Sequence, residues 1–434
     1  MRDRSAVMTA TLIMLCGLVA CGAEQADDEQ LIHYGLSAST GIFVTSEAGD
    51  RLAVKRDVQF ADGRATGTVI EVDPATLGQT LVGIGSSFTE SSAFVLAHLE
   101  PDARAEVMQS IYGEQGANFS LTRTTIGSTD FSVEGKFSYA PVADDAALEH
   151  FSIDVDRDGF SRTDYPGIRD ESFDLLPMIR EALEIKKGQA DPTLRIVSSA
   201  WTAPPWMKDI EDWYYRPPDE IGMEGTGGVL KEEYVQTYAD YLVRYLDAYA
   251  AEGIDIWGLT PVNEPNGNSG SWESMHFTPE TQNEFVKRHL GPALRDAGHG
   301  DVRLYVYDQN RDGLEHWTDV LFGDPETAPF VDGVAVHWYE STYKVYEDVL
   351  ERVHEKFPRM SILHTEGTID DLGKDAPEGV LDPEGFKESG WFDNDAFWWN
   401  ENAYIVFLQR PAYRFFRTER QIYVWISISH SGLD

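Results

Sequence analysis

Cysteine is almost absent from this chain, and its scarcity excludes two kinds of stabilisation. The 434 residues contain two cysteines, Cys16 and Cys21, both near the start. Arg2 and Arg4, followed by the apolar residues 8–19, are typical of an export signal too short to span a bilayer comfortably. Once such a signal is removed, no pair of cysteines is left. The sequence therefore predicts a domain without disulfides or a cysteine-based metal site, stabilised by its hydrophobic core.

Residues 18–21, with the sequence Leu-Val-Ala-Cys, resemble the lipobox of bacterial lipoproteins. This resemblance implies that residues 1–21 are a signal peptide, that Cys21 is lipidated, and that residues 22–35 are a polar tether. We therefore expect a protein anchored to the bacterial cell envelope, at the outer membrane or cell surface, that does not span the membrane. The alternative is an ordinary cleaved signal peptide and a secreted protein.

Positive charge is also scarce. Lys and Arg together number 35 against 74 Asp and Glu, which gives a formal net charge of −39 at pH 7. A surface with this excess repels nucleic acids and anionic lipid head groups. The composition therefore excludes nucleic acid as a partner, and it leaves the lipid anchor as the expected link to a membrane.

From about residue 80, the apolar runs are short and alternate with longer amphipathic segments. This alternation is typical of β-α units that build a parallel sheet. We expect strands at residues 81–86, 118–126, 195–200, 256–262, 303–307, 331–337 and 360–365. Repeated β-α units of this number predict an α/β fold of the (β/α)8 TIM-barrel type, in which chemistry takes place at the carboxyl ends of the strands.

The clearest helical pattern covers residues 231–252, where five tyrosines recur at spacings of three and four and Gly253 follows as a C-cap. We interpret this tyrosine stripe as packing against the sheet and not as a cofactor site. Other helices are expected at residues 101–112, 173–187, 279–297 and 343–356.

The regions on either side of the barrel are predicted to be smaller. Strands of a small β-element are expected within residues 36–79, at residues 41–45, 52–58 and 67–72. The barrel is expected to occupy residues 80–403. Residues 404–434 form an atypical tail of basic and aromatic composition, in which residues 421–429 could supply an eighth strand.

Two glutamates stand at the ends of short apolar runs. Glu264 follows residues 256–263 and Glu366 follows residues 360–365, so each carboxyl group is expected at the end of a buried strand. A buried unpaired charge is strongly disfavoured, so each acid should face a cleft. Two such endings suggest an acid/base pair, and cleavage of a glycosidic bond requires two carboxyl groups. On its own, Asn263 followed by Glu264 could equally form a polar turn.

The Asn-Glu-Pro sequence at residues 263–265 and the glutamate that ends a later strand resemble a clan of retaining barrel glycosidases. In that clan the acid/base follows strand four and the nucleophile follows strand seven. Further segments resemble glycoside hydrolase family 30, the glucosylceramidase family: GIGSSFTE at 83–90, RTTIGSTDFS at 123–132, SAWTAPPWMK at 199–208 and VHWY at 336–339. Together with the two glutamate segments they span residues 81–367 in the order of the family.

This resemblance implies a retaining hydrolase of β-D-glucosidic bonds, with Glu264 as general acid/base and Glu366 as nucleophile. The substrate that it implies is a β-glucoside, a glycolipid or a β-glucan. It also implies a sugar pocket lined by Arg123, Asp130, Trp201, Asn263, His337, Trp338 and Tyr339.

The residues themselves leave some of these roles open. Arg123, a charge within an apolar strand, needs a carboxylate partner, and Glu366 or Asp130 would serve. A structural pair of Arg123 with an aspartate is the alternative. His337 is either a core histidine or a hydrogen-bond partner of a carboxylate or sugar, and the two tryptophans are either core residues or sugar platforms.

The match to the family ends near Asn402. Family members close the barrel with an eighth strand and complete a side domain with a C-terminal β-sandwich, so we expect these parts to be missing or altered here. An alternative function is therefore a non-catalytic surface lipoprotein that binds glycans, and a further possibility is a chain that does not fold stably.

Residues 154–159, Asp-Val-Asp-Arg-Asp-Gly, begin like a calcium-binding loop. Position twelve of that pattern needs a bidentate glutamate, but this chain has Tyr165 there. We therefore expect an acidic surface loop, and no metal ion or other cofactor.

Overall fold

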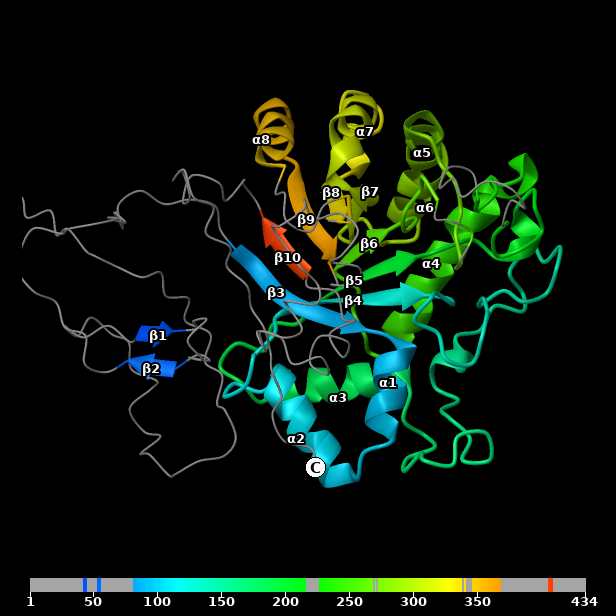
Figure 1. Ribbon diagram of the computed structural model, residues 1–434. Helices are drawn as coiled ribbons and strands as arrows, with labels where there is room; N and C mark the ends of the chain where they lie inside the picture. Colours follow the sequence, from blue (N-terminus) through cyan, green and yellow to red (C-terminus); the bar gives the residue numbers. More distant parts are fainter. Residues whose placement is uncertain are drawn as a thin grey trace, which may run out of the picture.

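The computed structural model describes most of the predicted barrel region (Figure 1). The described residues are 81–215, 226–267, 270, 272–337, 339–340 and 346–367, together with three short strands at residues 42–44, 53–55 and 405–408. Within these ranges, no helix has the length and apolar character that crossing a membrane requires.

A ring of strands forms the centre of the fold, and seven of them run parallel in sequence order. They are β3 (Leu81–Phe88), β4 (Leu121–Ile126), β5 (Arg195–Ala200), β6 (Gly258–Thr260), β7 (Arg303–Asn310), β8 (Gly333–His337) and β9 (Ser361–Glu366). The α/β class and all seven predicted strands are confirmed. The structure shortens β6 to three residues and extends β7 by three beyond the predicted end.

The eighth position of the ring is occupied by β10 (Ile405–Leu408), which pairs antiparallel with both β3 and β9 (Figure 1). A complete (β/α)8 barrel has a parallel strand in this position. The parallel part of the barrel is therefore incomplete, and a strand of opposite direction fills the gap. The predicted eighth strand at residues 421–429 lies outside the described residues.

Helices lie around the outside of the ring (Figure 1). They are α1 (Glu90–Ala97), α2 (Pro101–Tyr112), α3 (Leu175–Lys187), α4 (Val235–Ala251), α5 (Pro279–Phe285), α6 (Gly291–Asp296), α7 (Leu314–Leu321) and α8 (Glu347–Lys356). Single turns occur at η2 (Asp154–Asp156), η3 (Pro205–Met207), η4 (Glu232–Tyr234), η6 (Arg311–Gly313) and η7 (Ala328–Phe330), and a π-helical turn, η5 (Val286–Leu290), joins α5 to α6.

The predicted helices are confirmed with small changes at their ends. The helix expected at residues 279–297 is one run that η5 interrupts between α5 and α6. Two helices were not predicted, α1 and α7, and each has only eight residues. Such short helices carry little periodic signal and depend on tertiary packing.

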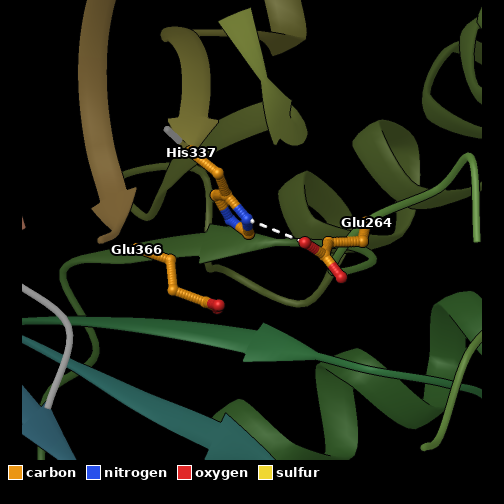
Figure 2. A group of neighbouring side chains, drawn as sticks. All are labelled: Glu264, His337 and Glu366. Atoms are coloured by element: carbon orange, nitrogen blue, oxygen red, sulfur yellow. Dashed lines mark hydrogen bonds and ion pairs between the residues drawn. The ribbon is translucent and has the colours of Figure 1, made fainter. Parts of the chain in front are cut away.

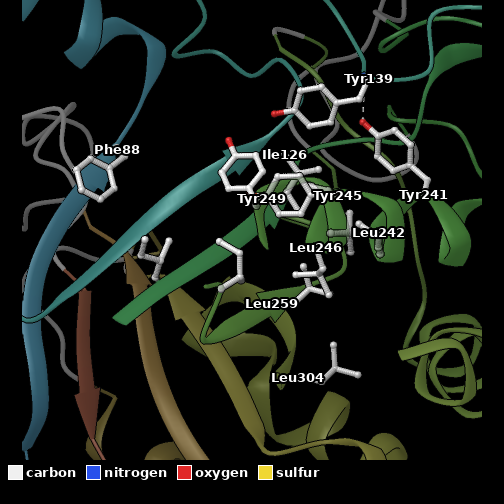
Figure 3. Packing of buried hydrophobic residues seen from close by; sticks show 14 of the residues in the cluster. Phe88, Ile126, Tyr139, Tyr241, Leu242, Tyr245, Leu246, Tyr249, Leu259 and Leu304 are labelled. Atoms are coloured by element: carbon white, nitrogen blue, oxygen red, sulfur yellow. Dashed lines mark hydrogen bonds between the residues drawn. The ribbon is translucent and has the colours of Figure 1, made fainter. Parts of the chain in front are cut away.

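Four of the five tyrosines of the predicted stripe lie on α4 and pack against the sheet, as predicted, whereas Tyr234 lies in η4 and is half-buried. Tyr238, Tyr241, Tyr245 and Tyr249 are at most 1% exposed. The ring of Tyr139 stacks on those of Tyr241 and Tyr245, with centroids 6.2 and 6.0 Å away (Figure 3). Stacked aromatic pairs of this kind each contribute about 0.5–1.5 kcal/mol beyond the area they bury.

The loop that resembles a calcium site is only partly exposed. Asp154 and Asp158 are on the surface, but Asp156 is buried. The hydroxyls of Tyr139 and Tyr249 both donate to Asp156 Oδ2, each at 2.7 Å. The prediction of an acidic surface loop is therefore wrong for Asp156, because two tyrosine hydroxyls offer this carboxyl group partners inside the core.

Of the small β-element, the structure describes β1 (Ile42–Val44) and β2 (Ala53–Lys55), which pair antiparallel. Two of its three predicted strands are thus confirmed, and the strand expected at residues 67–72 lies outside the described residues. The predicted signal peptide at residues 1–21 and the tether at residues 22–35 also lie outside them.

Candidate active site

The side chains that point into the ring of strands form two layers. The lower layer is apolar, fully buried, and consists of Leu121, Val197, Tyr305, Ala335 and Leu363. Because side chains alternate between the two faces of a strand, the residue two positions further along also points inward. On four of these strands that residue is polar: Arg123, Ser199, His337 and Thr365. A polar layer thus lies above the apolar one, towards the carboxyl ends of the strands.

β7 contributes to the polar layer through a bulge. Its register with β8 shifts between Tyr307 and Gln309, and Tyr307 and Asp308 have φ angles of 76° and 58°. A β-bulge changes the direction of a side chain and is frequent next to active sites. It brings Asp308 into the polar layer, where this residue is completely buried.

Arg123 on β4 connects the members of this layer. Its Nη1 donates to Glu366 Oε2 at 2.5 Å, and its Nε donates to Ser199 Oγ at 2.9 Å. Its Nη2 donates to the side-chain oxygens of Asn263 and Asp308, both at 2.8 Å. Burial alone would lower the pKa of Arg123, but the charges of Asp308 and Glu366 outweigh burial and raise it. The guanidinium is therefore a permanent cation at the centre of the site.

The predicted carboxylate partner of Arg123 was Glu366 or Asp130. The ion pair with Glu366 is confirmed, but the second carboxylate is Asp308. Asp130 lies instead on the loop after β4 and is exposed. Partial removal of its carboxyl group from water, together with the negative charges of Glu366 and Glu264, raises the pKa of Asp130 well above its usual value. Asp130 is thus an exposed acidic group near Glu264 and Glu366, outside the buried network.

His337 at the end of β8 joins two carboxyl groups. Its Nδ1 lies 3.3 Å from Glu264 Oε1 and its Nε2 lies 3.1 Å from Asp308 Oδ1. Burial alone would lower the pKa of the imidazole. The charge of Glu366 and the contacts with Asp308 and Glu264 outweigh burial and raise the pKa of His337 to about 10. His337 is therefore a hydrogen-bond partner of carboxylates, and its ring carries a positive charge.

Asp308 is a fully satisfied buried carboxylate. Besides Arg123 and His337, the hydroxyl of Thr260 donates to it at 2.6 Å and that of Thr365 at 2.5 Å. Burial would raise the pKa of Asp308, but the charge of Arg123 and the hydrogen bonds from His337 and Thr260 hold it well below its usual value. Asp308 therefore supplies the fixed negative charge of the network.

Glu264 follows β6 in a strained backbone conformation. Its φ is +50°, which is uncommon for a non-glycine residue and costs about 1–3 kcal/mol, which the surrounding structure must offset. Here its backbone N–H donates to the carbonyl of Asp308 at 3.0 Å. The residue is 7% exposed, and this burial raises the pKa of Glu264, while the hydrogen bond and charge of His337 act in the opposite direction.

The side chains of Glu264 and Glu366 extend towards one another across the site (Figure 2). An oxygen of each carboxyl group and one ring nitrogen of His337 all lie within 4.8 Å of one another. Both glutamates are 7% exposed, so each keeps a small accessible surface but is mostly surrounded by protein. At this short separation, both carboxyl groups can contact the same small chemical group.

The site contains a permanent cation, Arg123, a histidine whose protonated form is favoured, His337, and three buried carboxyl groups, on Asp308, Glu264 and Glu366. Two negative charges balance two positive charges. The site is therefore neutral when two of its three carboxyl groups are ionised and the third is protonated. The pKa of Asp308 is lowered and that of Glu264 is raised. Glu264 therefore holds a proton more readily than Asp308 does.

Two other predicted site residues contact the network directly. The Tyr339 hydroxyl donates to Glu366 Oε1 at 2.9 Å, and its backbone N–H donates to the side chain of Asn310 at 2.9 Å. Asn263 accepts from Arg123, and its own N–H donates to the carbonyl of Ala200 at 2.6 Å. Both residues therefore help to fix the two glutamates in place.

Trp201 is only 2% exposed, so its ring mostly contacts protein. The guanidinium of Arg123 lies 4.7 Å from its ring centre, and Phe131 meets it edge-on at 6.4 Å. Of the two roles that the sequence left open, this burial favours packing, in which Trp201 supports Arg123. The predicted sugar-binding Trp338 and the predicted lipidation site Cys21 lie outside the described residues.

The donor set of Glu264, His337 and Glu366 could in principle hold a metal ion, because its ligand atoms are within 4.8 Å of one another. A histidine ligand must be neutral and offer a ring nitrogen lone pair. Both ring nitrogens of His337 already face carboxylate oxygens, which raises the pKa of the ring to about 10, and Arg123 already lies against Glu366. These contacts fit a charge-balanced acid pair better than a metal site.

The sequence did not reveal four residues that hydrogen-bond within the network of Arg123 beneath the two glutamates: Ser199, Thr260, Asp308 and Thr365. The hydroxyls look like ordinary strand residues. Asp308 lay just beyond the predicted end of its strand, and its inward direction depends on the bulge in β7. The sequence signal for Asp308 was the charge of Arg123 within an apolar strand, because a buried cation needs carboxylate partners. In the structure Asp308 and Glu366 both pair with Arg123.

Comparison with known proteins agrees with this architecture. Putative glucosylceramidase 3 of Caenorhabditis elegans is 30% identical over 368 residues, which are 82% of this chain and 64% of the relative. Endo-1,6-beta-D-glucanase of Neurospora crassa is 28% identical over 301 residues, which are 68% of this chain and 55% of that protein. This chain therefore spans less than two thirds of the length of these relatives.

Among solved structures, SrfJ from Salmonella typhimurium shares the fold with a TM-score of 0.63 and 24% identity, over 78% of this chain and 67% of that one. Residues 81–382 match the model of the glycosyl hydrolase family 30 TIM-barrel domain, and this match includes every described residue of the site. The resemblance seen in the sequence is thus confirmed: the chain belongs to glycosyl hydrolase family 30.

Proposed function

We propose that this chain is a retaining β-glycoside hydrolase in which Glu366 is the nucleophile and Glu264 the general acid/base. The observation that carries the proposal is the distance of at most 4.8 Å between an oxygen of each carboxyl group. Retaining enzymes hold their two carboxyl groups about 5–5.5 Å apart, whereas inverting enzymes need about 6.5–9.5 Å to admit a water molecule. The short separation supports the two-step reaction.

In the first step, Glu366 attacks the anomeric carbon and Glu264 gives its proton to the leaving oxygen. Arg123 and Tyr339 each hold one oxygen of Glu366, which orients the carboxylate for attack. The charge balance of the site keeps Glu264 protonated until the leaving group departs. This arrangement satisfies the requirement that an acid catalyst have a raised pKa.

In the second step, water attacks the glycosyl-enzyme and Glu264 accepts the proton of that water. Formation of the ester removes the negative charge of Glu366 from the network. The remaining cations, Arg123 and His337, then favour the ionised form of Glu264, because a nearby positive charge lowers the pKa of a carboxyl group. The same residue can therefore act as acid in one step and as base in the next.

The proposed substrates are β-D-glucosides, in the form of a glycolipid or a β-glucan. Support comes from two relatives, one named as a putative glucosylceramidase and the other as an endo-1,6-beta-D-glucanase. We also retain the proposal that Cys21 carries a lipid anchor at the bacterial cell envelope, based on the lipobox-like sequence at residues 18–21.

Hydrolysis of aryl β-glycosides by the purified chain tests this function. We expect activity on an aryl β-glucoside, release of the β-anomer as first product by NMR, and no measurable turnover in Glu366→Gln with an unchanged circular dichroism spectrum. Glycan binding without hydrolysis in the folded wild-type chain would support a non-catalytic surface protein instead. Full activity in Glu366→Gln would contradict the assignment.

A further inference from the structure

Lys208 is a completely buried lysine that the proposed reaction does not use. It follows the turn η3, after β5. Its Nζ donates to three backbone carbonyls, those of Trp213 at 2.9 Å, Gly227 at 3.0 Å and Ser274 at 2.8 Å. An ammonium group has three N–H donors and no acceptor, so these three carbonyls use its full capacity.

The three carbonyls come from two connections of the barrel. Trp213 and Gly227 belong to the connection from β5 to α4, and Ser274 belongs to the connection from β6 to α5. Backbone hydrogen bonds also join them, from Ser274 N to the Trp213 carbonyl at 3.2 Å and from His276 N to the Gly228 carbonyl at 2.8 Å. A Cβ on Gly227 would lie 2.4 Å from Met275 N, so the pieces are tightly packed. Lys208 is thus the centre of a clamp that joins these two loops.

The clamp reaches the proposed active site through the connection from β6 to α5, which contains Glu264. The far end of this connection returns to its start, because Phe277 N donates to the carbonyl of Pro265 at 3.0 Å. In the middle, Glu273 accepts a hydrogen bond of 2.8 Å from Ser128, just after β4. The leaving group must lie next to the acid that protonates it, so these loops border the leaving-group side of the cleft.

We propose that Lys208 is a positioning residue whose ammonium group fixes the loops after β5 and β6 and thereby sets substrate affinity at the leaving-group side. This inference rests on the proposed function, because Glu264 as acid/base defines which side that is. Lys208 does not touch the network of Arg123, and so it should affect binding more than the chemical step.

The clamp should depend on pH. A neutral amine has two donors and a lone pair, which would face a carbonyl oxygen. Burial lowers the pKa of Lys208 to about 7, against the opposing effect of its acidic neighbours Asp212, Asp209 and Glu273, whereas Lys136 acts in the same direction as burial. The loops should therefore loosen as the pH rises above about 7.

Substitution of Lys208 gives the first test, with Lys186 as matched control. Lys186 is also buried, but it donates to Asn118 and lies in the last turn of α3, away from the clamp. With an aryl β-glucoside we expect Lys208→Met to raise KM by about tenfold or more and to change kcat by less than about threefold. Lys186→Met should leave KM unchanged in its folded fraction.

The conservative variant supplies a readout that a merely structural role would not give. A guanidinium keeps its charge throughout, so Lys208→Arg should restore much of the affinity, with a KM that stays flat between pH 6.5 and 8.5. The KM of the wild type should rise across the same range. An equal loss of kcat and kcat/KM in Lys208→Met, or a wild-type KM without this rise, would overturn the proposal.

Hydrogen exchange of the wild-type chain tests the clamp without any variant or activity. We expect protection factors for the amides of Ser274 and His276 to fall between pH 6 and 8.5, relative to those of β4. Constant protection would overturn the clamp even if hydrolysis is observed. Conversely, a chain that shows this loss but hydrolyses no glycoside would retain the clamp and refute the proposed function.

Discussion

Replacement of His337 by Gln should move the alkaline limb of the kcat/KM profile to higher pH. His337 carries a positive charge 3.3 Å from Glu264, and this charge lowers the pKa of that carboxyl group. A glutamine keeps hydrogen-bonding capacity but removes the charge. The alkaline limb reports loss of the proton from the general acid, so it should follow the pKa of Glu264 upward.

The size of the effect can be bounded from the geometry. Two unit charges 3.3 Å apart interact by roughly 5 kcal/mol at an effective dielectric constant of about 20, which corresponds to between three and four pH units. His337 shares its charge with Asp308, 3.1 Å from its other nitrogen. We therefore expect an upward shift of about one to two pH units.

The fold should survive this change. Asp308 loses one hydrogen bond but keeps its contacts with Arg123, Thr260 and Thr365. The loss of one buried hydrogen bond costs about 1–3 kcal/mol of the free energy of unfolding. Urea unfolding of the variant should show a cooperative transition, which makes its pH profile interpretable.

The assay is kcat/KM for an aryl β-glucoside measured from pH 4 to 9, with His364→Gln as matched control. His364 lies on β9, and burial lowers its pKa to about 3, so this histidine is neutral and its replacement removes no charge. The control should keep the wild-type alkaline limb. An unchanged or lowered limb in His337→Gln, or the same shift in both variants, would refute the reasoning.

Three further predictions follow from the same contacts. Glu264→Gln should slow hydrolysis of substrates with poor leaving groups by about a thousandfold or more, because no acid then protonates the leaving oxygen. Added azide should restore turnover of an activated aryl glucoside and give a β-glycosyl azide as product. Failure to form this azide would contradict the role of Glu264 as acid/base. Arg123→Lys keeps the charge but loses the fork that reaches four partners, so urea unfolding should show a loss of about 2–4 kcal/mol, and unchanged stability would contradict the network. Burial raises the pKa of Asp156 to about 7, so the folded state keeps a proton that the unfolded chain releases near pH 4. Stability from this group is therefore complete below about pH 4 and is lost as the pH rises to about 7, by up to about 4 kcal/mol, and Asp156→Asn should flatten this slope in urea titrations; an unchanged slope would show that Asp156 is not the group involved.

The parts of the fold that the sequence predicts are those with local signals. Seven short apolar runs became seven parallel strands, and the two glutamates that end such runs lie within 4.8 Å of one another. A carboxylate at the end of a buried strand is costly unless a cleft accepts it, so this position alone points to a site. The inward layering of Arg123 and His337 follows from the alternation of strand residues.

The parts that were missed depend on contacts distant in sequence. Asp308 enters the site through a bulge whose register is set by β8. Asp156 is buried because Tyr139 and Tyr249 bring hydroxyls to it from other segments. The antiparallel β10 pairs with strands far earlier in the chain. No local pattern encodes these pairings.

Covalent trapping tests the central claim most directly. A 2-deoxy-2-fluoro-β-D-glucosyl fluoride slows both steps of a retaining reaction but slows release of the glycosyl-enzyme more. Mass spectrometry of the treated chain should show one sugar per molecule, attached to the peptide that contains Glu366, and no label in Glu366→Gln. A chain that hydrolyses aryl β-glucosides but carries no adduct, or carries it on Glu264 or Asp130, would contradict the account.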